Sequence, residues 1–499
     1  MDGYVALFAN RGMQRIVLSL LLLMVWALPC SAPVSTNVPL DHWSYDAVEK
    51  LANYDLIDGA MLTTKPITRI EMARHIAQAM YRLKEQDNPP SVLLAIMERL
   101  KKEFEGELML IGLLDGWYGD SVIKPLEDPY VRYLYAKRRP ELENMRGDIF
   151  HWGSNFRAGF ASRGTLFDRA AFYLHPEYAN PADEDNGDVD LIEGYGKVMA
   201  GPFEIEVGKD SLWWGPGHHG SILMSNDAAP FTMVKITNPQ PVQLPWIFRR
   251  VGPFKAEWFL ADLGDNSTVP DTKLTGLRLN VRPSHLLELG FSRVIMFGGQ
   301  GAPSVDAFDY AKMFFALSEQ EQNNQIAGAD ASLLIPLVKS RLLRSVRFYG
   351  DGAGEDESGM LPSKWSYLLG VQLNDILRTG RTDLRLEYAD MHQVAYIHNF
   401  YTSGYTYDRR FIGHHAGTDS RDLFVQLSHY LTDDLLVDLS FDRQTYTLSG
   451  GVHEATNAFE GNVTLFPSSD WRLKAGYRYE NGDREDDNHI FQFLLIREF

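Results

Sequence analysis

Two short segments of the chain carry most of the residues that could do chemistry. Gly208–Gly220 has the sequence GKDSLWWGPGHHG, and Gly413–Asp422 has the sequence GHHAGTDSRD. Paired tryptophans beside glycines and a proline cannot form a regular strand throughout, so Gly215–Gly217 predicts a tight turn or an inward fold. Aromatic ring faces can hold sugars, which makes Trp213 and Trp214 candidates for stacking on a polysaccharide. The alternative is that they are interface anchors or internal packing.

The histidine pairs of these segments suggest either a metal site or a polar network. Imidazoles and carboxylates ligate transition metals. Adjacent residues on a strand point in opposite directions, however, so the two histidines of one pair do not easily ligate one ion. We therefore expect no metal and no cofactor, and predict a polar network that closes the interior or fixes an internal loop. Its predicted members are Asp210, Gly215, Pro216, Gly217, His218, His219, His414, His415, Asp419 and Asp422.

An acidic polysaccharide would further require cationic side chains. The candidates are Lys209, Arg249, Arg250, Arg409 and Arg410. The alternative is that these cations are rim or interior charges paired with nearby acids, which would leave them little binding role.

The elements that must position these residues are strands. From about residue 150 onward, apolar and polar residues alternate in segments separated by turn residues, as in strands with one lipid face and one lumen face. A soluble sandwich would alternate in the same way, so other features must decide. In the clearest segment, Trp471, Leu473, Ala475, Tyr477 and Tyr479 alternate with Arg472, Lys474, Arg478 and Glu480.

Both ends of the chain favour a membrane barrel. The apolar run 16–28 follows a positive flank, is too short to span a membrane as a helix, and stops at small residues suited to cleavage. We therefore predict a signal peptide over 1–32, with lipidation of Cys30 as an alternative. The terminal residue, Phe499, resembles the signal that the barrel-assembly machinery reads.

No later segment has a long uncharged apolar run, so a membrane-spanning chain would have to be a closed barrel. At about 10 residues per crossing, residues 150–499 predict an all-β outer-membrane barrel of about 14 to 18 antiparallel strands. The wall alone cannot fill so wide a lumen, which we expect to be plugged or aqueous. The formal net charge of −18 disfavours nucleic acid as a partner.

A small all-α segment is predicted before the barrel. Residues 43–54 have apolar side chains at helical spacing, and Thr68 with Glu71 predicts a capping box at the start of a second helix. A third stretch, 92–104, is also amphipathic. The spans 41–43, 56–59 and 68–71 (DHW, LIDG and TRIE) resemble an S-layer-homology module.

This resemblance covers residues 38–84 and leaves 85–149 as a helical spacer. It implies a periplasmic module that binds peptidoglycan or another cell-wall polymer. The candidate contacts are Trp43 and Arg69, with a core tryptophan and a surface arginine as the alternative.

The Gly208–Gly220 and Gly413–Asp422 segments, together with the C-terminal barrel, resemble the Wzi family of capsule-assembly proteins over about 150–499. The resemblance implies an outer-membrane lectin that helps to assemble or tether capsular polysaccharide or exopolysaccharide. The alternative is a porin with a peptidoglycan anchor. A glycan-cleaving enzyme would need a carboxylate pair, and nothing in the sequence pairs the candidates, so we expect no catalysis. These candidates are Glu204, Glu206, Asp210 and Glu387.

Overall fold

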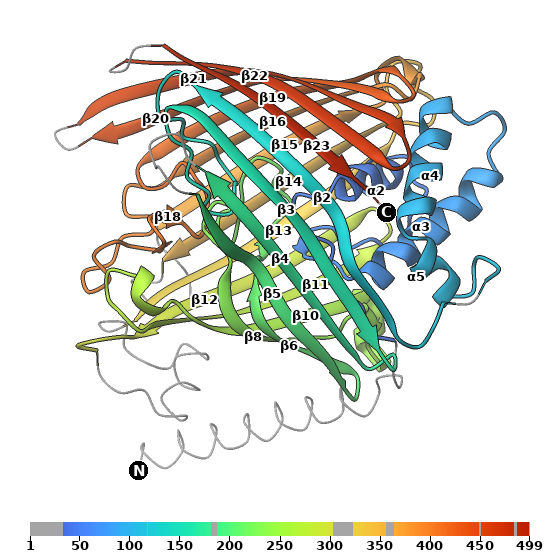
Figure 1. Cartoon of the computed structure of the whole chain (residues 1–499), viewed down its shortest axis with the longest axis horizontal. Helices are drawn as coiled ribbons and strands as arrows, with labels where there is room; N and C mark the ends of the chain where they lie inside the picture. Colours follow the sequence, from blue (N-terminus) through green and yellow to red (C-terminus); the bar gives the residue numbers. More distant parts are fainter. Residues whose placement is uncertain are drawn as a thin grey trace.

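The chain forms a closed antiparallel barrel with helices gathered at one end (Figure 1). The computed structural model describes residues 33–116, 118–180, 187–302, 323–355, 364–448, 451–483 and 487–498. The predicted signal peptide and the terminal Phe499 lie outside these residues. In the part described, no helix has the length and apolar character needed to cross a membrane.

The barrel wall has 18 strands, in agreement with the predicted 14 to 18. Strand β23 pairs with β2, which closes the sheet and leaves no wall edge unpaired in lipid. In order around the barrel the strands are β2 (Val122–Ala136), β3 (Gly153–Leu166), β4 (Ala170–Asn180), β5 (Asp188–Ala200), β6 (Phe203–Asp210), β8 (Phe231–Thr237), β10 (Pro253–Asp262), β11 (Thr272–Ser284), β12 (Leu287–Gly298), β13 (Asn324–Pro336), β14 (Ser345–Glu355), β15 (Lys364–Asn374), β16 (Thr382–Met391), β19 (Ser420–Thr432), β20 (Leu435–Leu448), β21 (Val452–Ser468), β22 (Trp471–Gly482) and β23 (Asn488–Arg497).

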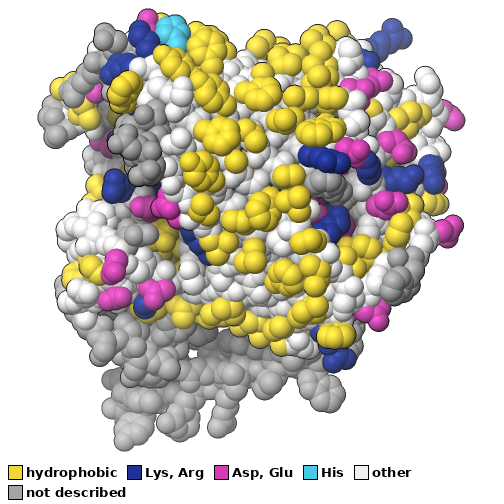
Figure 2. Space-filling view, viewed as in Figure 1, with side chains coloured by type: hydrophobic (Ala, Val, Ile, Leu, Met, Phe, Trp, Pro, Cys, Tyr) yellow, Lys and Arg dark blue, Asp and Glu magenta, His cyan; other side chains and the backbone are white. Residues whose placement is uncertain are grey.

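The predicted alternation of side chains is confirmed along the wall. On β22, Trp471 is 38% and Tyr477 39% exposed, whereas Arg478 is buried in the lumen. Figure 2 shows hydrophobic side chains spread over the outside of the strands, as expected for a surface that meets lipid. Outward residues that are about half exposed include Leu369, Leu439, Phe459 and Phe491.

The barrel begins earlier in the chain than predicted. The segment 85–149, expected to be a helical spacer, contains α4 (Ser91–Glu103) and α5 (Glu105–Leu110) but also the whole of β2. Pairing of β2 with β3 shifts register twice between Lys124 and Tyr130, around two prolines. Prolines and bulges interrupt the period-two pattern, which explains why the sequence hid this strand.

The connections at the two ends of the barrel differ in length. At the end that holds the helices, which we call the turn end, several strands are joined by two residues only, as at 201–202, 433–434 and 469–470. At the opposite end, the loop end, long segments such as 137–152, 211–230 and 392–419 join the strands.

The N-terminal helices plug the turn end. The helices α2 (Ser44–Asn53) and α3 (Arg69–Lys84) pack with α4 and α5 around a shared apolar core. The plug is tied to the wall by polar contacts: Lys50 Nζ lies 2.6 Å from Asp383, and Asn53 donates to the Asn374 side chain at 3.0 Å. The predicted module is therefore docked in the barrel rather than free of it.

The cap of α3 forms only half of the predicted box. The Thr68 hydroxyl accepts the Glu71 amide at 3.2 Å, as expected. The Glu71 carboxylate accepts from Lys255 Nζ of β10 at 2.7 Å instead of from the Thr68 amide. Lys255 of the barrel wall therefore takes the place of the Thr68 amide as donor to Glu71, because α3 begins inside the lumen.

Two loops fold into the lumen from the loop end and build a second apolar core. The segments 211–230 and 392–419 supply large buried side chains that pack against the lumen face of β8, β10, β11 and β12. The second segment contains a small hairpin, β17 (Thr406–Tyr407) with β18 (Arg410–Phe411). The fully buried members from the loops include Trp214, Leu223, Tyr401 and Tyr405. Plug and loops together fill much of the barrel interior.

Candidate functional site

The tryptophan pair lies where the plug and the inward loop meet. Trp213–Trp214 forms a short strand, β7, that pairs antiparallel with β1 (Thr64–Lys65) of the N-terminal segment. Trp214 is 1% exposed and its indole Nε1 donates to Glu257 Oε1 at 2.7 Å; Trp213 is 7% exposed. Stacking on a sugar requires an exposed ring face, so this placement contradicts the predicted sugar contact and leaves the packing alternative.

The turn that follows is the predicted tight turn. Gly215 has φ +139°, and a Cβ there would lie 2.7 Å from Ser221 Oγ and 2.8 Å from Asp351 Oδ2. Its amide donates to the Thr63 carbonyl at 2.9 Å. Pro216 and Gly217 then carry the chain to the histidines. Only glycine combines this backbone conformation with so close an approach.

A single carboxylate fixes the first histidine pair. Glu387 of β16 accepts the amides of His218 and His219 at 2.7 and 2.9 Å. The two rings point in different directions. His218 approaches Asp46 and Glu49 of the plug, whereas His219 stacks on Phe424 with ring centroids 3.9 Å apart.

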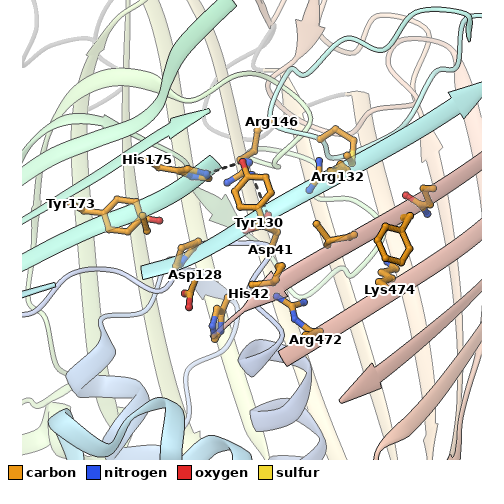
Figure 3. Close-up of a pocket in the computed structure, with 17 residues that line it drawn as sticks. Asp41, His42, Asp128, Tyr130, Arg132, Arg146, Tyr173, His175, Arg472 and Lys474 are labelled. Carbon is orange, nitrogen blue, oxygen red and sulfur yellow. Dashed lines mark hydrogen bonds and ion pairs between the residues drawn. The ribbon is translucent and has the colours of Figure 1, made fainter. Parts of the chain in front are cut away.

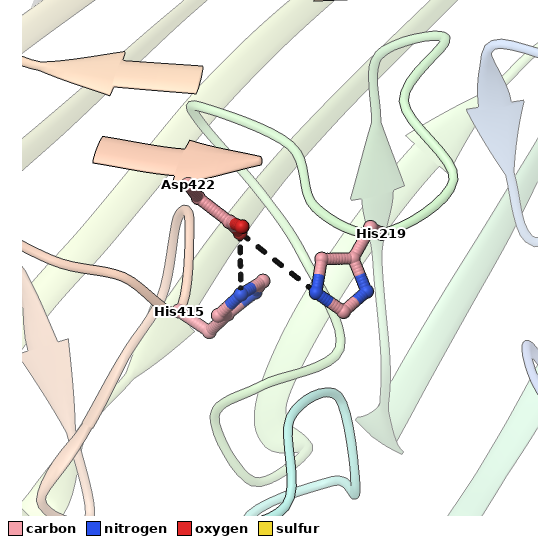
Figure 4. A group of neighbouring side chains, drawn as sticks. All are labelled: His219, His415 and Asp422. Atoms are coloured by element: carbon pink, nitrogen blue, oxygen red, sulfur yellow. Dashed lines mark ion pairs between the residues drawn. The ribbon is translucent and has the colours of Figure 1, made fainter. Parts of the chain in front are cut away.

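Three histidines from the two pairs approach the carboxylate of Asp422, and Figure 4 shows two of them, His219 and His415. His415 Nε2 lies 3.0 Å and His219 Nε2 3.8 Å from Asp422 Oδ2. Burial would lower the pKa of His219, but Asp442 and Asp422 raise it to about 10. The pKa of His415 is also raised, because the Asp422 carboxylate outweighs burial. His414 lies 3.8 Å from the same oxygen, and burial lowers its pKa well below the usual value.

The other members of the predicted network are distributed over the interior. Asp210 accepts from the Asn37 side chain at 2.7 Å and from Lys235 Nζ at 3.3 Å, which ties the start of the plug to β6 and β8. Asp419 takes part through its backbone, since its amide donates to the His392 carbonyl and its carbonyl accepts the Thr447 amide.

Two of the carboxylates weighed for catalysis are held in ion pairs. Glu204 lies 2.7 Å and Glu206 3.4 Å from Lys197 Nζ, and Glu206 also lies 3.0 Å from Lys235. All four side chains are at most 2% exposed. These acids therefore stabilise cations in the lumen and have no open surface for a glycan.

A cationic cavity lies at the loop end of the lumen. Its volume is about 610 Å³, and it brings together two predicted cations, Lys209 and Arg409, with three that the sequence analysis missed. The five cations are Arg132, Arg139, Arg146, Lys209 and Arg409; the acids on its wall are Asp148, Glu177, Asp190 and Asp408. Arg132 and the loop 137–152 were missed because the barrel was predicted to begin at 150. The alternation of Val131, Tyr133 and Tyr135 with Arg132 was a usable signal.

The remaining predicted cations lie elsewhere. Arg249 and Arg250 are exposed on the short helix η1 (Trp246–Val251), in the connection 238–252 at the turn end. They lie at the end of the barrel opposite Arg409 and do not line the cationic cavity. Arg410 is half-buried, with its guanidinium 3.9 Å from Asp227.

A smaller cavity continues from this one toward the plug (Figure 3). It has a volume of about 240 Å³ and shares Arg132, Met145 and Arg146 with the cationic cavity. Tyr130, which donates to Glu177 and lies 3.0 Å from His175, forms part of its wall. Asp41 and His42, from the N-terminal segment that forms the plug, also line this cavity.

The residues predicted to bind the cell wall are internal. Arg69 is 3% exposed, pairs with Glu103 and Glu107 at 2.8 Å each, and stacks over Phe104. Arg69 is therefore neither a contact to the cell wall nor a surface arginine, because its guanidinium donors are used inside the plug. Trp43 is half-buried, with its ring centroid 6.0 Å from that of Phe466.

Comparisons with known proteins agree with this architecture. A family model described as capsule assembly protein Wzi matches residues 135–492. A protein of Klebsiella pneumoniae, described as an uncharacterized 55.8 kDa protein in the cps region, is 32% identical over 182 residues. That match spans 36% of this chain and 36% of the relative, about a third of its length.

A solved structure has the same fold. It is Wzi, described as an outer-membrane protein involved in group 1 capsule assembly in Escherichia coli and as a carbohydrate-binding β-barrel. The two share a TM-score of 0.71 at 20% sequence identity, over 94% of this chain and 100% of that one. Because the family model covers well over half of the residues, this chain belongs to the Wzi family of outer-membrane capsule assembly proteins.

Proposed function

We propose that this protein is a non-enzymatic outer-membrane lectin that binds an acidic capsular polysaccharide or exopolysaccharide and helps to hold it at the cell surface. The observation that carries the proposal is the cationic cavity at the loop end, where Lys209 and Arg409 meet Arg132, Arg139 and Arg146. The description of the Escherichia coli structure as a carbohydrate-binding barrel supports it.

The orientation expected of outer-membrane barrels points this cavity outward. Such barrels have short periplasmic turns and longer extracellular loops. The turn end, with its helices, would then face the periplasm, and the loop end would face the medium. The cavity therefore lies on the side where a surface polysaccharide is found.

The charges on the cavity wall favour an anionic ligand. Arg139 and Arg409 are exposed and form no hydrogen bond or ion pair with other described residues, whereas Arg146 pairs with Asp41 and Lys209 donates to the Leu191 carbonyl. Two of the acids are also engaged. Asp148 pairs with Arg157 at 3.0 Å, and Glu177 accepts from Tyr130. Guanidinium groups bind carboxylates through paired hydrogen bonds, so a uronic acid or another acidic sugar fits this wall.

The filled lumen favours tethering over transport. In the described residues, the plug and the inward loops pair with each other through β1 and β7, so packed segments lie across the lumen between its two ends. A polysaccharide chain could bind at the loop end but could not thread through the barrel.

We expect the double variant R139A/R409A to bind acidic polysaccharide at least about tenfold more weakly, since two charged hydrogen-bond donors are lost. The measurement is a pull-down with the native polysaccharide, together with the amount of polysaccharide shed by cells that carry the variant. Binding should also weaken as salt is raised.

The matched control is R249A/R250A, which removes the same charge from exposed arginines at the turn end. It should bind and retain polysaccharide like the wild type. Equal binding by both double variants, or a loss in the control alone, would contradict the proposed surface.

Wall anchoring by the helical segment is a second candidate function. It is favoured by Tyr81, an aromatic that is 67% exposed on α3 at the end expected to face the periplasm. Co-sedimentation of the protein with purified peptidoglycan tests it. We expect Y81A to reduce sedimentation, and equal sedimentation of wild type and Y81A would rule out this contact.

A further inference from the structure

Four side chains from four separate elements point into one place at the loop end. They are His219 of the loop 211–230, His415 of the loop 392–419, Asp422 of β19 and Asp442 of β20. The donor atoms of His219, His415 and Asp422 all lie within 4.8 Å of one another. Asp442 lies beside this group, with its Oδ2 3.4 Å from His219 Nε2.

These side chains are largely buried, and several of their polar atoms lack hydrogen bonds. The side chains of His415 and Asp422 are each 3% exposed. Apart from the ion-pair contacts that they make with one another, both imidazole nitrogens of His415, both carboxylate oxygens of Asp422 and Nε2 of His219 have no hydrogen-bond partner. Buried polar atoms without partners are costly, and a metal ion that replaced the imidazole protons would engage these nitrogens and both carboxylates at once. The group is arranged to receive a cation.

We propose that His219, His415, Asp422 and Asp442 form a binding site for one divalent transition-metal ion, with Zn²⁺ the best match. Two imidazoles and two carboxylates suit zinc and its first-row neighbours better than Ca²⁺ or Mg²⁺, which prefer all-oxygen ligands. Zinc–ligand bonds of roughly 2.1 Å place tetrahedral ligands about 3.4 Å apart. The observed 3.0 to 3.8 Å contacts bracket this spacing.

The surroundings orient the ligands as outer partners of metal sites do. Gln444 Nε2 donates to Asp442 Oδ2 at 2.9 Å. The ring of His219 is stacked on Phe424, and its amide is held by Glu387. These contacts set the ligand positions before any ion binds.

The site differs from the expectation that the histidine pairs hold no metal. That expectation rested on the two members of one pair pointing apart, as His218 and His219 do. His414 and His415 instead stack with ring centroids 4.4 Å apart, and both approach Asp422. The proposed site instead takes one histidine from each pair, His219 and His415, and adds acids from the wall. A bound ion would tie both inward loops to β19 and β20, independently of polysaccharide binding.

The test uses the full-length protein purified without a polyhistidine tag, stripped with a chelator and titrated with Zn²⁺. We expect one equivalent to bind and to raise the thermal unfolding midpoint. The variants H415A and D422N should bind at least about tenfold more weakly and lose the thermal shift. A calcium titration should show no comparable shift.

The control is H285A, which removes an exposed histidine at the turn end and should bind zinc like the wild type. D422N keeps the shape of the side chain, and heat-modifiable migration on gels verifies that each variant is folded. Absence of stoichiometric zinc binding by the wild type, or equal binding by wild type, H415A and D422N, would overturn the proposal.

Discussion

Single residues of the Gly208–Gly220 segment hold the barrel interior together. Trp214 is an example. Its ring packs against Phe259, with ring centroids 5.4 Å apart, and its indole nitrogen donates a hydrogen bond to the buried carboxylate of Glu257. A residue type suited to sugar recognition thus serves a structural purpose, because both its apolar faces and its one donor are used inside the protein.

We expect W214F to lower stability by about 1 to 3 kcal/mol, since it leaves Glu257 buried without its donor. The temperature at which heat-modifiable migration is lost should fall, while polysaccharide binding by the folded variant is retained. W152F, at an exposed tryptophan of the loop end, is the control and should change neither. A folded W214F protein that no longer bound polysaccharide would restore a binding role for this ring.

At the scale of elements, ion pairs dock helix α2 in the lumen. Glu49 Oε2 lies 2.7 Å from Arg385 of β16, beside the ion pair that the next residue, Lys50, forms with Asp383. Burial would raise the pKa of Glu49, but Arg385 and Arg347 lower it to about 2. A carboxylate with a depressed pKa stabilises the folded state above its unfolded pKa, near 4.5, and this contribution is lost as pH falls toward 2.

We therefore predict that acidification from pH 5 to pH 2.5 loosens the plug. The thermal midpoint should fall over this window, and proteolysis at the exposed ends of α2 and α3 should speed up. E49Q should start from a lower midpoint and show a shallower dependence on pH, because it removes the titrating group. Parallel curves for wild type and E49Q would exclude Glu49 as the source of the acid sensitivity.

The plug also shows how a helix segment and a barrel become one unit. Arg69 of α3 pairs with Glu107 of α5, and the same carboxylate accepts from Arg163 of β3 at 2.9 Å. A buried chain of alternating charges of this kind stabilises one docked arrangement, because removing any member leaves its partner uncompensated.

At the scale of the whole molecule, two cores fill the barrel from opposite ends. The helical core occupies the turn end, the core of inward loops lies toward the loop end, and they meet where Thr64–Lys65 pairs with Trp213–Trp214. Figure 1 shows the helices and the chain's C-terminal end together at the turn end. In the part of the chain that the structure describes, the wall encloses these two packed cores and the cavities beside them.

We expect the purified protein to show little steady conductance in planar bilayers, since the plug and the inward loops block the lumen. A general porin measured in the same bilayers is the control and should show large, stable steps. Cells that lack the protein should release polysaccharide into the medium. Large steps from this protein, combined with normal retention of polysaccharide, would favour the solute-channel alternative.

Local patterns in the sequence were enough to predict the architecture. The alternation around Trp471–Glu480 indicated the wall, the amphipathic stretch 92–104 indicated α4, and Thr68 indicated the start of α3. Each depends on neighbours within a few positions, so the sequence carries the signal directly. The first strand escaped prediction because Pro125 and Pro129 interrupt the same pattern.

Only the tertiary structure decided which side chains meet. In the sequence, Arg249 and Arg409 were equivalent candidates for binding an acidic polysaccharide. Closure of the barrel places Arg249 at the turn end and Arg409 at the loop end. The sequence contains two histidine pairs, and the inward loops bring His219 of the first pair beside the second pair, His414 and His415, while His218 lies apart. These contacts depend on long-range strand pairing and on loops that fold back into the lumen, and no local periodicity encodes either.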